Sequence, residues 1–159
     1  MVGGIEEHTP IYVELYRKAK KLNQDNSHKY YEGKMLGMQM GEGSAFFVLS
    51  SEKKNAKAAI NGVGFSYKPR HLKELLDKLD LFLNQHNTTL NNIDLVLFGF
   101  SGDKDFDKYM LDMLPIVLNT SATGYFKHLC GDYHTSGAFA LWLANKIIEK
   151  QKIISISAH

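Results

Sequence analysis

The sequence predicts an α/β layered fold, because short apolar strands alternate along the chain with amphipathic helices. The clearest helix begins near Arg70, where apolar residues recur at intervals of three and four: Leu72, Leu75, Leu76, Leu79, Phe82 and Leu83. The clearest strand is residues 93–100 (IDLVLFGF), which are nearly all apolar, as expected of a strand covered on both faces. A shorter apolar stretch at residues 44–49 follows two glycines and predicts a buried strand entered through a glycine turn.

The chain before residue 70 contributes one further helix and one further strand. Thr9 and Pro10 predict a helix over residues 10–21, because threonine caps free backbone amides and proline is tolerated at the first helical position. Residues 22–34 are polar and unpatterned, which predicts a surface loop. Residues 56–67 predict a second strand, whose two glycines indicate a bulge or a close backbone approach.

The last third of the chain predicts four more elements. A short helix is expected around residues 106–113, and a strand at residues 115–118. Residues 135–150 form a helix that is apolar almost all round, and residues 152–157 form a closing strand. A helix of this kind needs cover on every side, and five strands offer little. We therefore expect the unit to pack against further protein.

The composition is that of a globular domain: 159 residues, of which 44% are hydrophobic and 23% charged. The formal net charge is +2 and no block of like charges occurs, so nothing favours nucleic-acid binding. A single cysteine, Cys130, indicates a reducing compartment, and we expect a cytoplasmic protein. The sequence shows neither a signal peptide nor a run of 18 apolar residues, so we expect no export and no membrane span.

One short pattern suggests a serine nucleophile. Residues 99–103 (GFSGD) follow the apolar strand and resemble a nucleophile elbow, G-x-S-x-G, in which Asp103 stands at the second glycine. The pattern predicts either a helix cap made by Ser101 or Asp103, or a serine hydrolase. In a hydrolase, Ser101 would be the nucleophile and His128 or His134 the base.

The single cysteine leaves two interpretations open. Cys130 lies near His128, and a neighbouring base activates a thiol as a nucleophile. A lone cysteine before a buried helix is more typical of a small core residue. One cysteine and seven scattered histidines give no metal-ligand spacing, and the turn at Gly41 lacks the further residues of a phosphate loop. We therefore expect neither a metal nor a cofactor.

Four segments, in this order and spacing, resemble the β-ketoacyl synthase family of the thiolase superfamily, over most of residues 2–148. Residues 2–7 (VGGIEE) are similar to the family's VGG-(V/I)-(D/E)-E segment, and residues 41–45 (GEGSA) to its GEGA turn. Residues 60–66 (INGVGFS) resemble the strand after that turn. Residues 128–141, in which HLCG precedes a small-residue helix, resemble the GHxxG-AAG segment.

The resemblance implies a thiolase-like fold, with residues 1–50 as the tail of the first half and residues 51–159 as the second half of one partial domain. It also implies a decarboxylating Claisen condensation of acyl and malonyl thioesters, in fatty-acid or polyketide synthesis. His128 matches the family's second histidine, and His134 competes with it if the glycine alignment shifts. The implied partners are acyl carrier protein and another synthase subunit, in a homo- or heterodimer.

The same resemblance implies a substrate pocket shaped by Gly41, Gly43, Ser101 and Gly131. The family's nucleophilic cysteine lies upstream of its VGG segment and has no counterpart here. The histidine of its HGTGT motif is also missing, since this chain reads GFSGD there, and so is the terminal glycine-rich motif. We therefore expect either part of a synthase that is inactive alone or a non-catalytic partner subunit comparable to chain-length factors.

Overall fold

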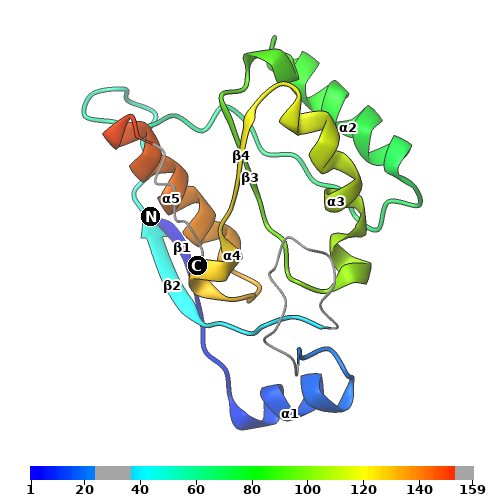
Figure 1. Ribbon diagram of the computed structural model, residues 1–159. Coiled ribbons are helices and arrows are strands. Elements are labelled where there is room, and N and C mark those ends of the chain that lie inside the picture. The colour runs from blue at the N-terminus through cyan, green and yellow to red at the C-terminus, as the bar shows by residue number, and fades with distance from the viewer. Residues whose placement is uncertain (24–36, 153–159) are drawn as a thin grey trace.

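The structure, a computed structural model, describes residues 1–23 and 37–152 and combines helices with two small sheets (Figure 1). This mixture agrees with the predicted α/β class. The strands pair two by two: β1 (Val2–Glu6) is antiparallel to β2 (Gly43–Phe47), and β3 (Leu95–Phe98) is parallel to β4 (Ala122–Tyr125). The strands predicted at residues 44–49 and 93–100 are thus confirmed as β2 and β3, each shorter than predicted.

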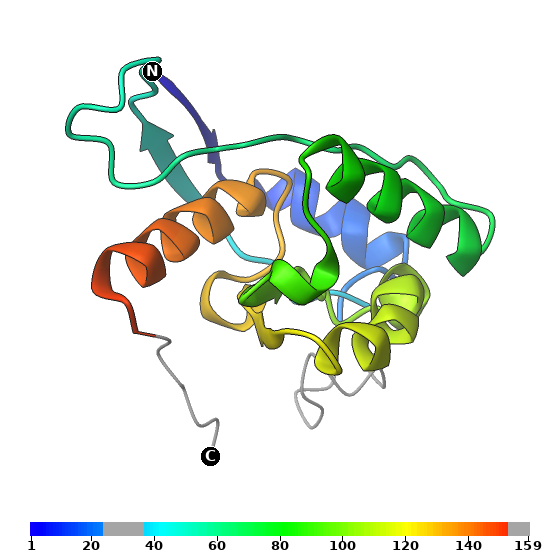
Figure 2. The same ribbon diagram turned by 90° about the horizontal axis from the view of Figure 1, so that it is seen from above.

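One layer of the molecule consists of the β1–β2 pair and α5 (Ser136–Lys150), which packs against β2 (Figure 2). Exposure alternates along β2, from half-buried Gly43 to exposed Ser44 and onwards, because successive side chains point to opposite faces. The helix predicted at residues 10–21 is confirmed as α1 (Pro10–Lys18), and the Thr9 hydroxyl caps it by accepting from the Tyr12 N–H at 3.3 Å.

The other layer is a strand–helix–strand unit. Helix α3 (Lys104–Leu118) joins the parallel strands β3 and β4, and α2 (Leu72–Gln85) packs beside α3. Buried residues Phe98, Phe100 and Val117 form its core, with the two phenyl rings stacked at 5.2 Å between centroids. A 3₁₀ turn at Leu90–Asn92 precedes β3, and the short α4 (Lys127–Cys130) follows β4.

The prediction of a strand at residues 115–118 is wrong, because these residues form the last turn of α3. Pro115 lacks the N–H that would bond one turn back, and its presence favoured an end to the helix. The helix nevertheless continues, since this keeps Val117 on the buried stripe that packs against Phe98 and Phe100. The next strand, β4, starts four residues after the helix ends.

One further prediction is corrected. Residues 56–67 form no strand, because within the described chain they have no neighbouring strand to pair with. The helix predicted at residues 135–150 is confirmed as α5. Within this chain its one buried residue is Ser136, whereas Trp142 and Ile148 are 43% and 47% exposed, so the cover expected from further protein stays a prediction. Nearly all of the strand predicted at residues 152–157, and nearly all of the loop predicted at residues 22–34, lie outside the described residues. No helix in the described ranges is long and apolar enough to cross a bilayer.

Candidate functional site

Two loops meet at the carboxyl ends of the parallel strands β3 and β4. The loop after β3 starts at Gly99, where an added Cβ would lie 3.4 Å from the Phe126 ring and 3.6 Å from the Lys127 side chain. Phe126 and Lys127 directly follow β4. In open α/β sheets, ligands bind outside the carboxyl ends of the strands, so this edge is the natural place for a site.

A third segment reaches the same edge through a backbone crossing at Gly41 and Gly131. A Cβ on Gly41 would collide with the Cys130 carbonyl oxygen, and one on Gly131 would collide with the Gly41 backbone. The crossing is fixed by two hydrogen bonds, from Gly41 N to Asp132 O at 3.1 Å and from Asp132 N to Gln39 O at 2.8 Å. Gly131 also has φ of +77°, which side-chain-bearing residues rarely adopt. Glycine is therefore required at both positions of this crossing, Gly41 and Gly131.

His128 lies on α4 within this assembly. Its ring packs against Tyr125 at 4.6 Å between centroids, and its Nδ1 is buried without a hydrogen-bond partner among the described residues. Burial lowers the pKa of His128, because removal from water disfavours the imidazolium. The ring is therefore neutral at pH 7 and keeps a buried nitrogen available for a hydrogen bond.

Cys130 is held as a protonated thiol. Its Sγ contacts the carbonyl oxygens of Phe126 at 3.8 Å and Gly131 at 3.4 Å. Burial raises the pKa of the Cys130 thiol and outweighs the opposing effects of a hydrogen bond with Tyr133 and of the Lys127 charge. This arrangement favours a small structural residue over a nucleophile.

An ion pair braces the turn between these residues. The Lys127 Nζ lies 2.5 Å from Asp132 Oδ1, and both side chains are about one-seventh exposed, at 15% and 14%. Tyr133 is buried, with its hydroxyl against Gly43. The predicted pocket residues Gly41, Gly43 and Gly131 are thus packed by backbone and aromatic contacts.

Ser101 belongs to a separate hydrogen-bond network at the same edge. Its hydroxyl donates to Asp107 Oδ1 at 3.0 Å and accepts from the Asp103 N–H at 3.1 Å. Asp107 is fully buried and also accepts from the N–H groups of Ser101 at 2.8 Å and Gly102 at 2.7 Å. Burial raises the pKa of Asp107, against the lowering effect of these donors and of Lys127. The hydroxyl of Ser101 is therefore occupied by the loop itself.

The predicted cap of α3 is made by Asp103. Its Oδ1 accepts from the N–H groups of Asp105 at 2.9 Å and Phe106 at 3.3 Å. This is the ordinary role of an aspartate at a helix N-cap. Together, the Asp103 cap and the Ser101–Asp107 network account for the polar residues of GFSGD without a catalytic base.

His134, the competing histidine, lies in a different cluster. Its Nδ1 lies 2.7 Å from Glu6 Oε1 and 3.1 Å from the Tyr12 hydroxyl, which in turn donates to Tyr16 at 3.0 Å. The bond to Tyr16, with burial, raises the pKa of Tyr12 to about 12. Burial of Glu6 opposes its ionisation, but hydrogen bonds from His134 and the Thr135 N–H outweigh it, so the pKa of Glu6 is lowered. His134 thus ties β1 to the start of α5.

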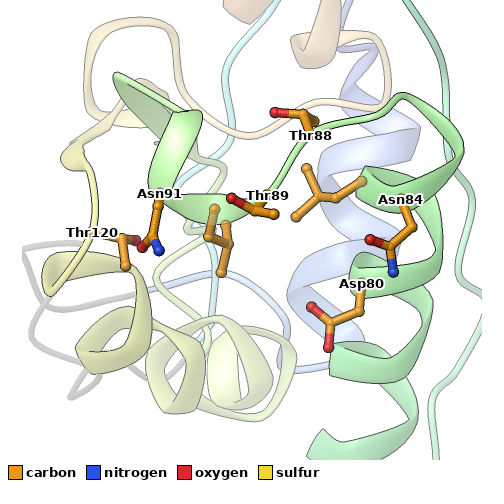
Figure 3. A pocket seen from close by; sticks show the side chains of 8 residues that line it. Asp80, Asn84, Thr88, Thr89, Asn91 and Thr120 are labelled. Atoms are coloured by element: carbon orange, nitrogen blue, oxygen red, sulfur yellow. The ribbon is translucent and has the colours of Figure 1, made fainter.

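A groove of about 430 Å³ opens at the opposite edge of the β3–β4 pair (Figure 3). Its polar lining comes from the second half of α2, the turn before β3 and one residue shortly before β4: Asp80, Asn84, Thr88, Thr89, Asn91 and Thr120. Leu83 and Leu90 complete it. None of the residues predicted to act in a site lines this groove.

The sequence reasoning missed Asp107, Tyr133 and the Lys127–Asp132 pair. Asp107 carries no sequence signal, because an aspartate in the first turn of a helix usually faces solvent. Within the described ranges, no group of three or more histidine, cysteine, aspartate or glutamate side chains is placed to hold a metal ion.

Comparison with known proteins finds no relative of this chain. No protein-family model matches the chain, and no curated protein or solved structure matches it significantly. The geometry of the site therefore carries the functional argument.

Proposed function

We propose that this chain is part of a β-ketoacyl synthase-like protein of fatty-acid or polyketide biosynthesis, with a thiolase-like fold and with His128 in its acyl pocket. One observation carries the proposal: three of the four family-like segments come together. Residues 2–6 pair with β2, which begins within the GEGSA segment at Gly43, and the first glycine of that segment, Gly41, crosses the HLCG segment at Gly131. The fourth segment, residues 60–66, stays apart from them, against α2.

His128 has the properties that the condensation needs from its histidine. Decarboxylation breaks the bond between the malonyl carboxylate and its neighbouring carbon and releases CO₂. The resulting enolate carbon then attacks the acyl thioester, a carbon–carbon bond forms, and the thiolate leaves. Negative charge builds on the malonyl thioester oxygen in the first step. A neutral imidazole N–H stabilises such an oxygen, and burial keeps His128 neutral.

In this proposal, the nucleophilic cysteine comes from a part of the synthase other than the four family-like segments. Cys130 does not fill that role, because burial raises the pKa of its thiol. Acyl carrier protein would deliver both thioesters, in the cytoplasm. The chain then contributes the pocket wall and one histidine, and catalysis requires the remaining part of the synthase.

The test is a condensation assay on the complete natural gene product, with acyl and malonyl carrier-protein thioesters. His128→Ala is expected to lower kcat at least about 100-fold, since one oxyanion donor contributes on that scale. His134→Ala tests the competing assignment, and His86→Ala, on the exposed end of α2, is the control. Full activity in His128→Ala would overturn the catalytic role.

A specific observation also favours a non-catalytic partner subunit as the alternative. The segment that corresponds to the family's first histidine motif is GFSGD, and its Ser101 and Asp103 are engaged in the buried network and the cap of α3. This loop contains no histidine that could take the place of the family's first histidine. A partner subunit would lack condensation activity in every form and would raise the activity of a separate synthase when mixed with it. Condensation activity of the chain itself, with no rise in the activity of the separate synthase, would exclude this alternative.

A further inference from the structure

The groove at the amino ends of β3 and β4 has walls that hydrogen bonds hold in place. On one side, the Thr88 N–H donates to Leu83 O at 3.0 Å and fixes the turn that leaves α2. On the other side, the Ser121 hydroxyl donates to Leu90 O at 3.3 Å and joins the segment after α3 to the turn before β3. The space of about 430 Å³ between these walls is therefore preformed, and its size is that of a small-molecule site, since such sites range from about 300 to 1,000 Å³.

The polar side chains of the groove are left available by the fold. Figure 3 shows Asp80 and Asn84 on α2, with Asn91 and Thr120 across from them and Thr89 in between. Within the described parts of the chain, no hydrogen bond or ion pair engages these side chains except at Thr120. The Thr120 hydroxyl donates to the backbone of α3 at 3.1 Å, so its oxygen still accepts a hydrogen bond. The groove therefore presents carboxylate, amide and hydroxyl oxygens to a hydrogen-bond donor.

Asp80 gives the groove its charge, because it is the only charged residue among the described lining residues. The other charged side chains of α2 pair with one another: Lys73 with Asp77 at 2.7 Å, and Lys78 with Glu74 at 3.1 Å. Among the residues that the structure describes, Asp80 has no ion-pair partner. The groove thus carries one uncompensated negative charge, which favours a cation.

Two helix ends add to the negative potential of the groove. Helix α2 ends one residue after Asn84, and α3 ends two residues before Thr120. The carboxyl end of a helix carries a partial negative charge and stabilises cations. Leu83 and Leu90 supply the apolar part of the lining. A matching ligand is therefore positively charged, rich in hydrogen-bond donors and partly hydrocarbon, whereas a phosphate or carboxylate would meet like charge.

We propose that the groove binds an aliphatic polyamine, with one ammonium group on Asp80 and methylene groups on Leu83 and Leu90. An ammonium group donates three hydrogen bonds and accepts none, which suits a lining of carboxylate, amide and hydroxyl oxygens. A second ammonium group donates to the side-chain oxygens of Thr89 and Asn91. An inorganic cation fills only a small part of the groove, since even a water molecule takes about 30 Å³. This assignment does not depend on the proposed function.

The experiment is isothermal titration calorimetry of the purified chain with spermidine, at low ionic strength so that screening is weak. We expect one saturable site. Asp80→Asn should weaken the binding at least about 10-fold, because it removes a charge-assisted hydrogen bond. Thr89→Val keeps the shape of the side chain but removes its hydroxyl, and should weaken the binding several-fold. Both residues are exposed, so the melting temperature should stay unchanged.

Asp77→Asn is the matched control. It makes the same change of charge on α2, at a residue that pairs with Lys73 and lies outside the groove lining, so the affinity should change less than about twofold. Butylamine, which has a single ammonium group, should bind at least about 10-fold more weakly than spermidine. In NMR spectra, the largest amide shifts on addition of spermidine should fall within residues 83–91 and 119–121.

Three outcomes would overturn the proposal. The first is the absence of saturable spermidine binding to the unaltered chain. The second is spermidine binding that Asp80→Asn leaves unchanged, which would place the ligand elsewhere on the surface. The third is glucose binding as tight as that of spermidine, which would show that the groove recognises hydroxyl groups and not a charged amine.

Discussion

At the scale of single residues, His128 and Cys130 illustrate how burial separates two potentially reactive side chains. The sequence places them two positions apart and leaves open which one acts. Burial lowers the pKa of the imidazole and raises that of the thiol, so both groups are neutral at pH 7. A neutral imidazole still donates a hydrogen bond, whereas a neutral thiol is a poor nucleophile.

The pKa of His128 can be measured directly. In NMR titrations of the imidazole resonances, His128 should titrate below the histidines of the same chain unfolded in urea. Since its folded pKa is depressed, its contribution to stability is present above the unfolded pKa and is lost as the pH falls through the folded value. A His128 pKa equal to that of the unfolded chain would contradict the buried environment.

The reactivity of Cys130 gives a second residue-scale prediction. Its alkylation by iodoacetamide at pH 8 should be several-fold slower than that of free cysteine, because burial raises its pKa and limits access. The pH dependence of the alkylation rate should have its midpoint above that of free cysteine. Rapid alkylation at neutral pH would show an activated thiolate and reopen the nucleophile interpretation.

Ser101 is predicted to be inert for the same kind of reason. Ser101 is only 5% exposed, and its hydroxyl donates a hydrogen bond to Asp107. A fluorophosphonate probe should therefore leave the chain unlabelled. The measurement is intact mass after incubation with the probe. Labelling that disappears in Ser101→Ala would instead support a serine hydrolase.

At the scale of elements, the Gly41–Gly131 crossing joins the glycine turn to the end of α4. Gly131→Ala is expected to lower the free energy of unfolding by about 2 kcal/mol or more, through a strained φ and a backbone collision. Gly137→Ala is the matched control: an added Cβ there meets nothing within 4 Å. In helix α5 this control should stabilise by about 0.5–1 kcal/mol. Urea unfolding of both variants provides the comparison.

Two buried carboxylates, Asp103 and Asp107, stabilise the start of α3 in different ways. Asp107→Asn replaces one acceptor oxygen by an NH₂ group that faces backbone N–H donors, so we expect a loss of about 2–4 kcal/mol. Asp103→Ala, which removes the helix cap alone, should cost about 1 kcal/mol. Equal effects of the two substitutions in thermal unfolding would contradict the central role of Asp107.

At the scale of the whole molecule, the sequence predicted elements that carry their own pattern and missed those that depend on distant contacts. Helix α2 was predictable, because its apolar stripe is local. The last turn of α3 was not, since only packing of Val117 on Phe98 shows that the helix continues. The resemblance placed Gly41 and Gly131 in one pocket, but the Glu6–His134 contact lies between segments whose spacing gives no signal.

The backbone crossing at Gly41 and Gly131 also bears on how the chain folds. The β3–α3–β4 unit closes over short chain distances, so it can form early. The crossing, by contrast, must bring together Gly41 and Gly131, which are 90 residues apart in the chain, and this costs the entropy of closing that long loop. We expect the β1–β2 layer to dock last, on a strand–helix–strand unit that is already in place. The candidate pocket would then be the final part of the molecule to assemble.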